Sequence, residues 1–305
     1  MNPLKVAVIG VGHLGTIHAR VYSELQSAQL VAVCDTAPDR ARQVANQFHC
    51  RPETDFRKLL KEVEAVSIAV PTHDHFKIAK AFLARGIHVL VEKPITRTVQ
   101  EADRLLKLAE KSRAVLQVGH VERFNAVLRK VQASLTNPRF IEVHRLAPFQ
   151  PRGTEVGVVL DLMIHDIDIL LGLVKSPIRR IDAVGVKVLT PFEDIANARV
   201  TFQNGSVANL TASRISKEAM RKFRIFQSDT YVSMDFLGQG VDIFRHNNGM
   251  ISHEKLTISG EEPLKAELAS FLEAVRHQCA PPVSGQEARE ALAVALKVTH
   301  LIHKK

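Results

Sequence analysis

The chain has 305 residues, 46% hydrophobic and 24% charged, which is typical of a folded protein with room for two domains. Its formal net charge of +9 favours anionic partners, but lysine and arginine are scattered along the chain and tryptophan is absent, so we expect an anionic small molecule and not nucleic acid. No apolar run approaches the roughly 20 residues of a membrane span, and we expect no membrane association.

The cysteines are Cys34, Cys50 and Cys279. Their odd number and wide spacing fit neither a disulfide framework nor a cysteine-rich metal site. The first strand is expected to begin by Leu4, which leaves no room ahead of it for a signal peptide. We therefore expect a cytoplasmic protein without a bound metal.

The first 120 residues alternate short apolar runs with segments of helical period, which is the pattern of a parallel sheet with crossover helices. Strands are expected at residues 5–9, 30–34, 66–70, 87–91 and 115–118, and helices near 38–48, 73–85 and 98–112. A further helix follows the first strand, and four apolar residues spaced three and four apart predict its buried face: Leu14, Ile17, Val21 and Leu25. Asp55 is expected to cap a short helix, and Gly86 to end a helix in a left-handed conformation. Thr98 and Glu101 have the spacing of a capping box.

From residue 139 onward, β-branched runs alternate with turn residues, which predicts a largely antiparallel sheet. Its strands are expected at residues 139–146, 178–189, 198–202, 206–215, 222–226 and 231–236, with helices at 160–173, 264–277 and 286–303. Asn204-Gly205 between two of these runs is a strong hairpin signal. We therefore expect an α/β Rossmann domain with a doubly wound parallel sheet over residues 1–120. An α+β domain for substrate binding and oligomerisation would follow over residues 121–305.

A G-x-G-x-x-G pattern, formed by Gly10, Gly12 and Gly15, follows the first strand and opens the next helix. The glycines permit a tight turn, a close approach of the backbone to a pyrophosphate and close packing of the helix, whose first amides face the phosphates. Asp35 stands at the end of the second strand, where a carboxylate accepts hydrogen bonds from the adenine ribose. Its negative charge would repel the 2′-phosphate of NADP and so favours NAD, and Arg40 nearby would weaken that preference. A glycine turn without a ligand is the alternative.

The tripeptide Glu92-Lys93-Pro94 comes directly after a strand, at the carboxyl edge where open α/β sheets bind ligands. Because the residue before a proline is disfavoured in helical geometry, Lys93 is expected in an extended, fixed pose. A lysine near the nicotinamide ring would donate to a substrate oxygen and polarise it. The alternative is an ordinary strand exit with a solvated lysine.

Asp161 and His165 are four residues apart, on one face of an expected helix, and Asp168 continues that face. A histidine beside a carboxylate is suited to act as a general base. The same spacing fits a metal, but further ligands would be required and no separate pair of such residues suggests itself. A partly buried helix with salt bridges is the remaining alternative.

Together these residues resemble the Gfo/Idh/MocA oxidoreductase family, over essentially the whole chain. The motifs that carry the resemblance are the glycine pattern, Pro71–His75, Glu92–Pro94, Arg123–Asn125, Asp161 with His165, and Pro282–Arg289. The resemblance implies NAD as the cofactor and a second domain with a large open sheet that commonly forms homodimers or homotetramers. The segment Arg152–Gly157 lacks the Gly-Gly pair that many members carry, which puts the shape of the substrate entrance in question.

By that resemblance, Lys93 is the active-site lysine and His165 the proton acceptor, with Asp161 beside it. The cofactor would be lined by Gly10, Gly12, His13, Leu14, Gly15, Asp35, Pro71, Thr72, His75, Glu92 and Lys93. The substrate would be met by Arg123, Asn125, Asp161, His165 and Arg214. The sequence does not decide whether Lys93 or His165 takes the proton.

Within the family, the segments Gly119–Asn125 and Ala212–Ser216 are most similar to nucleotide-sugar dehydrogenases, some of which oxidise the 3-hydroxyl of UDP-N-acetylglucosamine. A cationic segment suited to a diphosphate comprises Arg214, Lys217, Arg221, Lys222 and Arg224. Its alternative is a row of solvent-facing charges on an edge strand. We therefore expect reversible hydride transfer between NAD and a secondary hydroxyl of a sugar. The alternatives are an NAD-retaining glycosidase or lyase with transient oxidation, and a non-catalytic regulator that responds to NAD.

Overall fold

The computed structural model describes residues 2–151, 154–247, 249–260 and 262–304. The chain divides into two compact units. Unit 1 comprises Met1–Val121 and Glu262–Arg289, and unit 2 comprises Glu122–Glu261 and Glu290–Lys305. The first crossing between the units thus falls one residue past the expected boundary at residue 120. The segment Glu262–Arg289, which we expected in the second domain, belongs to unit 1.

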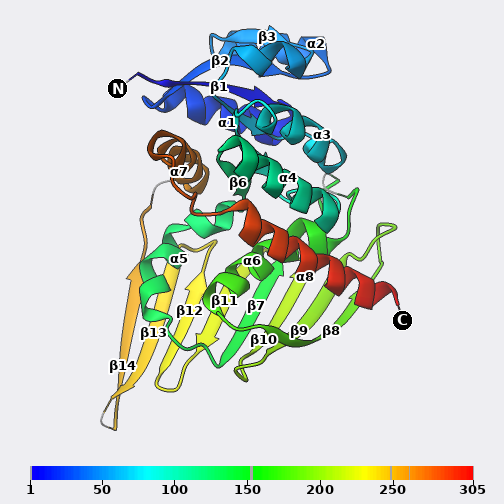
Figure 1. Cartoon of the computed structure of the whole chain (residues 1–305). Helices are drawn as coiled ribbons and strands as arrows, with labels where there is room; N and C mark the ends of the chain where they lie inside the picture. Colours follow the sequence, from blue (N-terminus) through cyan, green and yellow to red (C-terminus); the bar gives the residue numbers. More distant parts are fainter. Residues whose placement is uncertain (1, 152–153, 248, 261, 305) are drawn as a thin grey trace. The chain divides into compact units, whose positions relative to one another are not determined.

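Unit 1 contains a six-stranded parallel sheet, sheet A, with strand order β3-β2-β1-β4-β5-β6 (Figure 1). Its strands are β1 (Leu4–Ile9), β2 (Ala28–Cys34), β3 (Arg51–Glu53), β4 (Ala65–Ile68), β5 (His88–Glu92) and β6 (Leu116–Gly119). Its helices are α1 (His13–Glu24), α2 (Pro38–Gln47), a 3-10 helix (Phe56–Lys61), α3 (Thr72–Leu83), α4 (Val99–Ser112) and α7 (Pro263–His277). The strand order reverses between β1 and β4, and ligands of such sheets bind at the carboxyl edge beside this point. The Rossmann fold predicted from the sequence is confirmed.

The local signals at helix ends are also confirmed. The Asp55 side chain accepts the backbone N–H of Arg57 and caps the 3-10 helix. The Thr98 hydroxyl accepts the N–H of Glu101 at 3.2 Å at the start of α4, and Gly86 has a φ of +73° after α3.

The buried face predicted for α1 is wrong in part. Leu14 is 39% exposed, whereas the helix buries Gly15, His18, Ala19, Val21 and Tyr22. The close approach of Gly15 explains the difference, because a Cβ on Gly15 would lie 1.8 Å from the carbonyl oxygen of Gly10. The helix therefore presents Gly15 and the residues one turn later to the sheet, and a histidine is among them.

Unit 2 is built on an eight-stranded sheet, sheet B, with strand order β14-β13-β12-β11-β7-β10-β9-β8 (Figure 1). Its strands are β7 (Phe140–Leu146), β8 (Ile178–Val186), β9 (Ile195–Phe202), β10 (Val207–Ser213), β11 (Met220–Phe226), β12 (Thr230–Asp235), β13 (Gly240–Asn247) and β14 (Met250–Thr257). Neighbouring strands are antiparallel except β7 and β10, which are parallel. The expected open, mostly antiparallel sheet is confirmed, as is the hairpin at Gly205, whose φ is +85°.

One face of sheet B carries the hydrophobic core of unit 2. The helical segments of this unit are a 3-10 turn (Val121–Phe124), α5 (Ala126–Val131), a 3-10 turn (Gln132–Ser134), a π turn (Val159–Met163), α6 (Ile164–Leu173) and most of α8 (Gly285–His303). Buried residues of α6 and α8, such as Ile167 and Ala295, join Val143, Leu210 and Phe223 of the sheet in one cluster. Every residue of α6 from 164 to 170 is buried, so this helix packs on all sides and not along a single stripe.

Within the described part of the chain, we find no helix with the length and apolar character needed to cross a membrane.

Candidate active site

The glycine loop after β1 has the form that a bound dinucleotide requires. Gly10 has a φ of +84°, and a Cβ there would lie 2.7 Å from the carbonyl oxygen of Ala69. Gly15 packs against Gly10 as described above. Gly12, in contrast, has no heavy atom within 4 Å of the place where a Cβ would stand, so the space before the first turn of α1 is open. Backbone amides at a helix N-terminus facing open space fit a pyrophosphate.

Asp35 follows β2 and is buried beside this loop. Its Oδ2 accepts the N–H of Val11 at 3.0 Å and its Oδ1 accepts the N–H of Ala37 at 2.9 Å. Arg40 Nη1 lies 3.3 Å from Oδ2. The carboxylate therefore fixes the glycine loop in addition to the ribose-binding role expected from the sequence.

Replacing Asp35 by Ala should shift cofactor choice toward NADP, because the repelling carboxylate is removed while Arg40 remains. The measurement is kcat/KM with each cofactor. Loosening of the glycine loop should weaken both cofactors, so the NAD to NADP ratio reports the charge alone. An unchanged ratio would remove Asp35 from cofactor selection.

The other cofactor residues expected after β1 and β4 differ in exposure. His13, Leu14 and Pro71 are exposed, Thr72 is half-buried, and all four lie at the carboxyl edge of sheet A. His75 is buried, and its two ring nitrogens lie 2.9 Å from the carbonyl oxygens of Pro94 and Val70. Burial lowers the pKa of the His75 imidazole, although both carbonyls oppose the shift. The ring therefore fixes the chain after β5, and its contact with a cofactor stays a prediction.

Lys93 stands at the carboxyl end of β5, as expected. It is half-buried, its backbone N–H donates to Glu92 Oε2 at 3.2 Å, and its peptide bond to Pro94 is cis. His75 contacts the carbonyl oxygen of Pro94, and the side chain of Glu92 accepts the N–H of Lys93. The residues before and after Lys93 are therefore both held by hydrogen bonds.

The second group of expected catalytic residues lies in unit 2, where Asp161 belongs to the π turn before α6 and His165 to the first turn of α6. A π turn closes i→i+5 hydrogen bonds and is frequent at functional sites. The side chain of Asp161 is 27% exposed, and its Oδ2 lies 3.9 Å from Arg214 Nη2. Arg214 is itself buried and donates from Nη2 to the carbonyl of Val156 at 2.8 Å. The structure thus brings Asp161 and Arg214 together, with His165 one turn further along.

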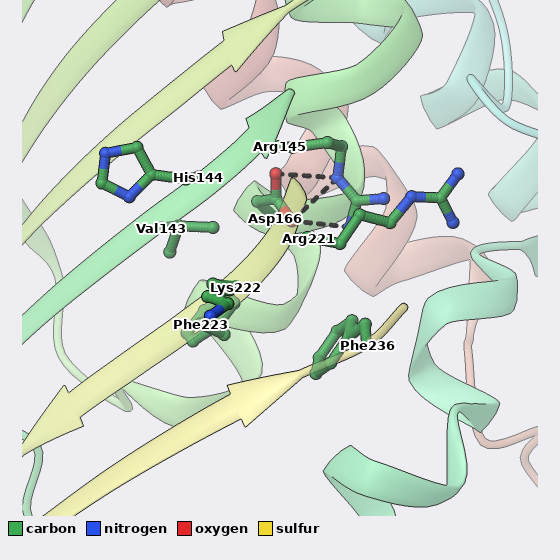
Figure 2. Close-up of a pocket in the computed structure, with 8 residues that line it drawn as sticks. All are labelled: Val143, His144, Arg145, Asp166, Arg221, Lys222, Phe223 and Phe236. Atoms are coloured by element: carbon green, nitrogen blue, oxygen red, sulfur yellow. Dashed lines mark hydrogen bonds and ion pairs between the residues drawn. The ribbon is translucent and has the colours of Figure 1, made fainter. Parts of the chain in front are cut away.

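Beside His165, the buried residues Glu122, Arg145 and Asp166 form a buried charge cluster, which the partly exposed Arg221 joins. Figure 2 shows Arg145, Asp166 and Arg221. Arg145 donates from Nε and Nη2 to Asp166 at 2.9 and 2.7 Å, and from Nη1 to Glu122 Oε1 at 2.8 Å. Arg221 Nη1 donates to the same oxygen of Glu122 at 3.1 Å. The hollow around Arg145, Asp166 and Arg221 has no room for a water molecule. The cluster therefore joins the start of α6, and with it His165, to β7.

The two carboxyls of the cluster respond differently to burial. Burial raises the pKa of Asp166 above its ordinary value, although the charge of Arg145 opposes the shift. Burial also acts on Glu122, but there the charges of Arg145 and Arg221 outweigh it and the pKa is lowered.

Replacing Arg145 by Met should lower the free energy of unfolding by about 3–5 kcal/mol, because Asp166 and Glu122 would lose their main buried partner. Denaturant unfolding curves at pH 8 provide the measurement. As a matched control, Arg180→Met removes an ion pair with Asp182 in which both side chains are largely exposed, and it should change the curve little.

The loss in Arg145→Met should shrink as the pH falls. Without Arg145, the already raised pKa of Asp166 rises further, so proton uptake neutralises the buried charge as the pH falls through that value. Equal losses at pH 5 and pH 8 would contradict this account of the cluster.

The cationic segment 214–224 does not lie on an edge strand, so that part of the alternative is wrong. β11 lies between β7 and β12. Lys222 and Arg224 point away from the core and lie 3.9 Å from Asp235 and 3.5 Å from Glu142, respectively. These two side chains therefore form ion pairs on the outer face of the sheet.

Arg221 instead lies on the core-facing side of β11, in line with the buried Phe223 and Ile225, and Arg214 directly follows β10. Arg145 is in register with Ala212 on one side and with Arg221 on the other. Three arginines from neighbouring strands therefore gather at one end of sheet B, on the face that carries α6.

Arg123 and Asn125, expected to meet the substrate, lie before α5. Asn125 is buried and its Oδ1 accepts the N–H of Val127 at 3.0 Å, which caps α5. Arg123 Nε lies 3.8 Å from Asp168 Oδ2, and a Cβ on Gly172 would come within 2.3 Å of its guanidinium. Both side chains thus have structural contacts, and their roles toward substrate stay predictions.

The segment Arg152–Gly157 is described in part, since Arg152 and Gly153 lie outside the described residues. Gly157 packs against the buried carboxylate of Glu193, where a Cβ would come within 1.9 Å of Oε1. A glycine is therefore required at the position that leads into the π turn.

Comparison with known proteins identifies the family. Residues 4–120 match the model of an oxidoreductase family with an NAD-binding Rossmann fold, GFO/IDH/MocA, and residues 127–232 match the C-terminal domain of the same family. The chain is 39% identical over 305 residues to the UDP-N-acetylglucosamine 3-dehydrogenase of Acidithiobacillus ferrooxidans, an alignment that covers 98% of this chain and 97% of the relative. The chain belongs to the GFO/IDH/MocA family. As a member, it is an NAD-dependent oxidoreductase, in agreement with the glycine loop and Asp35.

The chain is also similar to a solved structure of that enzyme and to more distant proteins. The structure of the Acidithiobacillus enzyme superposes with a TM-score of 0.94 and covers 100% of this chain and 99% of that one. The myo-inositol 2-dehydrogenase of Thermotoga maritima is 23% identical and covers 99% of this chain and 97% of the relative. A levoglucosan dehydrogenase solved with NADH is 18% identical, with a TM-score of 0.89 over 99% of this chain and 97% of that one, and this likeness shows the fold alone.

Proposed function

We propose that this chain is a dehydrogenase that oxidises the 3-hydroxyl of UDP-N-acetylglucosamine, or reduces the corresponding ketone, with NAD as hydride carrier. The observation that carries the proposal is the similarity along the whole chain to an enzyme of that name from Acidithiobacillus ferrooxidans. The three arginines at one end of sheet B support a substrate that carries a diphosphate.

The residues of each unit are assigned separate tasks in this reaction. The glycine loop and Asp35 would bind the pyrophosphate and the adenine ribose of NAD, which supplies the hydride acceptor when bound. We assign removal of the hydroxyl proton to the imidazole of His165 and stabilisation of the developing alkoxide to the ammonium of Lys93. Asp161 would orient the imidazole, while the buried charge cluster fixes the backbone that carries His165.

Among the three arginines, Arg221 is the one suited to recruit an anionic ligand. Its side chain is 45% exposed, whereas the side chains of Arg145 and Arg214 are almost entirely buried. Arg214, beside Asp161, would act closer to the reacting carbon, and Arg221 at the diphosphate.

Replacing Arg221 by Gln should raise KM for UDP-N-acetylglucosamine about ten- to hundredfold, the worth of a hydrogen bond to a charged group. KM for free N-acetylglucosamine should change little. Arg224→Gln is the matched control, because Arg224 lies on the same strand, faces away from the core and should leave both constants unchanged.

The assay follows NADH formation at saturating NAD. Equal effects of Arg221→Gln on both sugars would remove Arg221 from the diphosphate site. Consumption of the nucleotide sugar without net NADH would favour the NAD-retaining glycosidase or lyase over a dehydrogenase.

We also propose that the protein is a cytoplasmic homodimer or homotetramer. The outer face of sheet B carries a ladder of five aromatic rings on five adjacent strands: Phe140, Phe226, Tyr231, Phe244 and His253. Adjacent rings in this ladder lie between 4.2 and 5.7 Å apart, and four of the five side chains are half-buried within the single chain. Such a continuous aromatic row supports a contact between copies of the sheet, and the free cysteines are compatible with a reducing compartment.

A further inference from the structure

A buried histidine of unit 1 has no place in the cofactor or substrate contacts described so far. His18 lies on α1 among Ala19, Val21 and Tyr22, and it is fully buried. Its Nε2 lies 3.2 Å from Oε1 of Glu92, whose side chain is also buried. Burying a polar ring in an apolar cluster is costly unless the ring has such a partner.

Glu92 is fixed on three sides at the end of β5. His18 contacts Oε1 from α1, and the backbone N–H of Lys93 donates to Oε2 at 3.2 Å. On the third side lies Gly119 of β6, where a Cβ would come within 2.6 Å of Oε1. A side chain at position 119 would displace the carboxylate, so α1 and β6 together set its place next to Lys93.

The groups that face Glu92 favour its ionised form. They are His18 from α1, His75 from α3 and Lys93 beside it. Burial raises the pKa of Glu92, but the close contact with His18, followed by the charges of Lys93 and His75, outweighs burial and lowers the pKa. A buried negative charge is therefore kept directly beside the reactive lysine.

We propose that His18 is a positioning residue for Lys93, acting through Glu92: His18 holds the carboxylate in place, and the carboxylate orients Lys93. The catalytic meaning of this role rests on the function proposed above, in which Lys93 stabilises the alkoxide. His18 lies on α1, whose first turn includes the end of the glycine loop. The same helix would therefore bind the cofactor pyrophosphate at its N-terminus and position Lys93 through His18.

Removal of the His18 ring should alter the protonation of Lys93. In His18→Leu, Glu92 is a buried carboxylate without its first partner, so its pKa should rise. Lys93 then loses a neighbouring negative charge and gives up its own proton at lower pH. His18→Gln keeps an N–H donor near the position of Nε2 and should restore the native behaviour.

The experiment measures Lys93 directly and requires no substrate. Purified enzyme is acetylated with acetic anhydride across a pH series, and the extent of reaction at Lys93 is read by peptide mass spectrometry. Lys80, an exposed lysine of α3, is the internal control in the same spectra. The variants are His18→Leu, His18→Gln, Glu92→Gln and the double variant His18→Leu with Glu92→Gln.

We expect the pH midpoint of Lys93 reactivity to fall by about one unit in His18→Leu and in Glu92→Gln, and to stay near the native value in His18→Gln. In the Glu92→Gln background, His18→Leu should add nothing. The alkaline limb of the kcat profile should move with the labelling midpoint. If His18→Leu does not fold, the labelling midpoints of Glu92→Gln and His18→Gln still test whether Glu92 controls the reactivity of Lys93.

Two outcomes would overturn the proposal: an unchanged midpoint in folded Glu92→Gln, or a shift in His18→Leu that persists in the Glu92→Gln background. The labelling result is independent of the substrate assignment. If the midpoint shifts as expected but the native enzyme forms no NADH with UDP-N-acetylglucosamine, the proposed function fails and the positioning of Lys93 by His18 stands.

Discussion

Lys93→Met should lower kcat for the nucleotide sugar by about 10²- to 10³-fold, the usual effect of removing a donor to a developing oxyanion. Methionine keeps much of the length of the side chain but removes the charge, which is needed more in the transition state than in cofactor capture. The dissociation constant for NAD, measured by calorimetry, should therefore stay near the native value. Stopped-flow measurement of hydride transfer separates the chemical step from product release.

The control for this variant is Lys80→Met, which removes an exposed lysine from α3 of the same unit and should leave kcat unchanged. Oxidation of the nucleotide sugar at a native rate by Lys93→Met would move the reacting centre away from β5. A large loss of NAD affinity would instead mean that Lys93 contributes chiefly to cofactor binding.

The sequence allowed most of unit 1 to be predicted because its signals are local. The caps at Asp55 and Thr98 and the glycine after α3 each depend on residues within one turn of the chain. The parallel strands are short apolar runs that alternate with helical segments, which is the pattern of a parallel sheet with crossover helices. β3 was not predicted, since it has only three residues and includes Pro52.

Longer-range packing accounts for the errors. α7 returns to unit 1 because Leu268, Phe271 and Leu272 join the cluster that contains Val8 and Tyr22, and no local pattern marks that destination. β14 was not predicted, since nearly all of its residues are exposed and it lacks the alternation that marks a half-buried strand. In α1, the close approach of Gly15 determined the buried face in place of the apolar stripe.

The candidate site likewise contains residues that lie close together in the sequence and contacts between residues that lie far apart in it. Motif residues that are close in sequence, such as Glu92 with Lys93 or Asp161 with His165, could be recognised directly. The buried charge cluster could not, because Arg145 binds residues 21 and 23 positions away and Arg221 binds Glu122 across 99 positions. His18 was also missed, since a lone histidine on a helix gives no signal until the carboxylate it contacts is known.

His165→Asn should lower kcat by about two to four orders of magnitude, the usual worth of a positioned general base. Asparagine keeps a polar side chain of similar reach in the first turn of α6 but accepts no proton at neutral pH. For oxidation of the sugar, the acid limb of the kcat profile should disappear, because a deprotonated imidazole is no longer required. Steady-state rates over a pH series provide the measurement.

His144→Asn is the matched control for His165→Asn, because His144 lies on β7 of the same unit, one residue before Arg145 and on the opposite face of sheet B. It should keep both kcat and the acid limb. The buried charge cluster adds a second test, since Arg145→Met should lower kcat through the position of His165 while the acid limb persists. A persistent acid limb in His165→Asn, with its loss in Lys93→Met, would exchange the two roles and make Lys93 the proton acceptor. Loss of the limb in His165→Asn alone places the proton on the imidazole and leaves the lysine to stabilise charge.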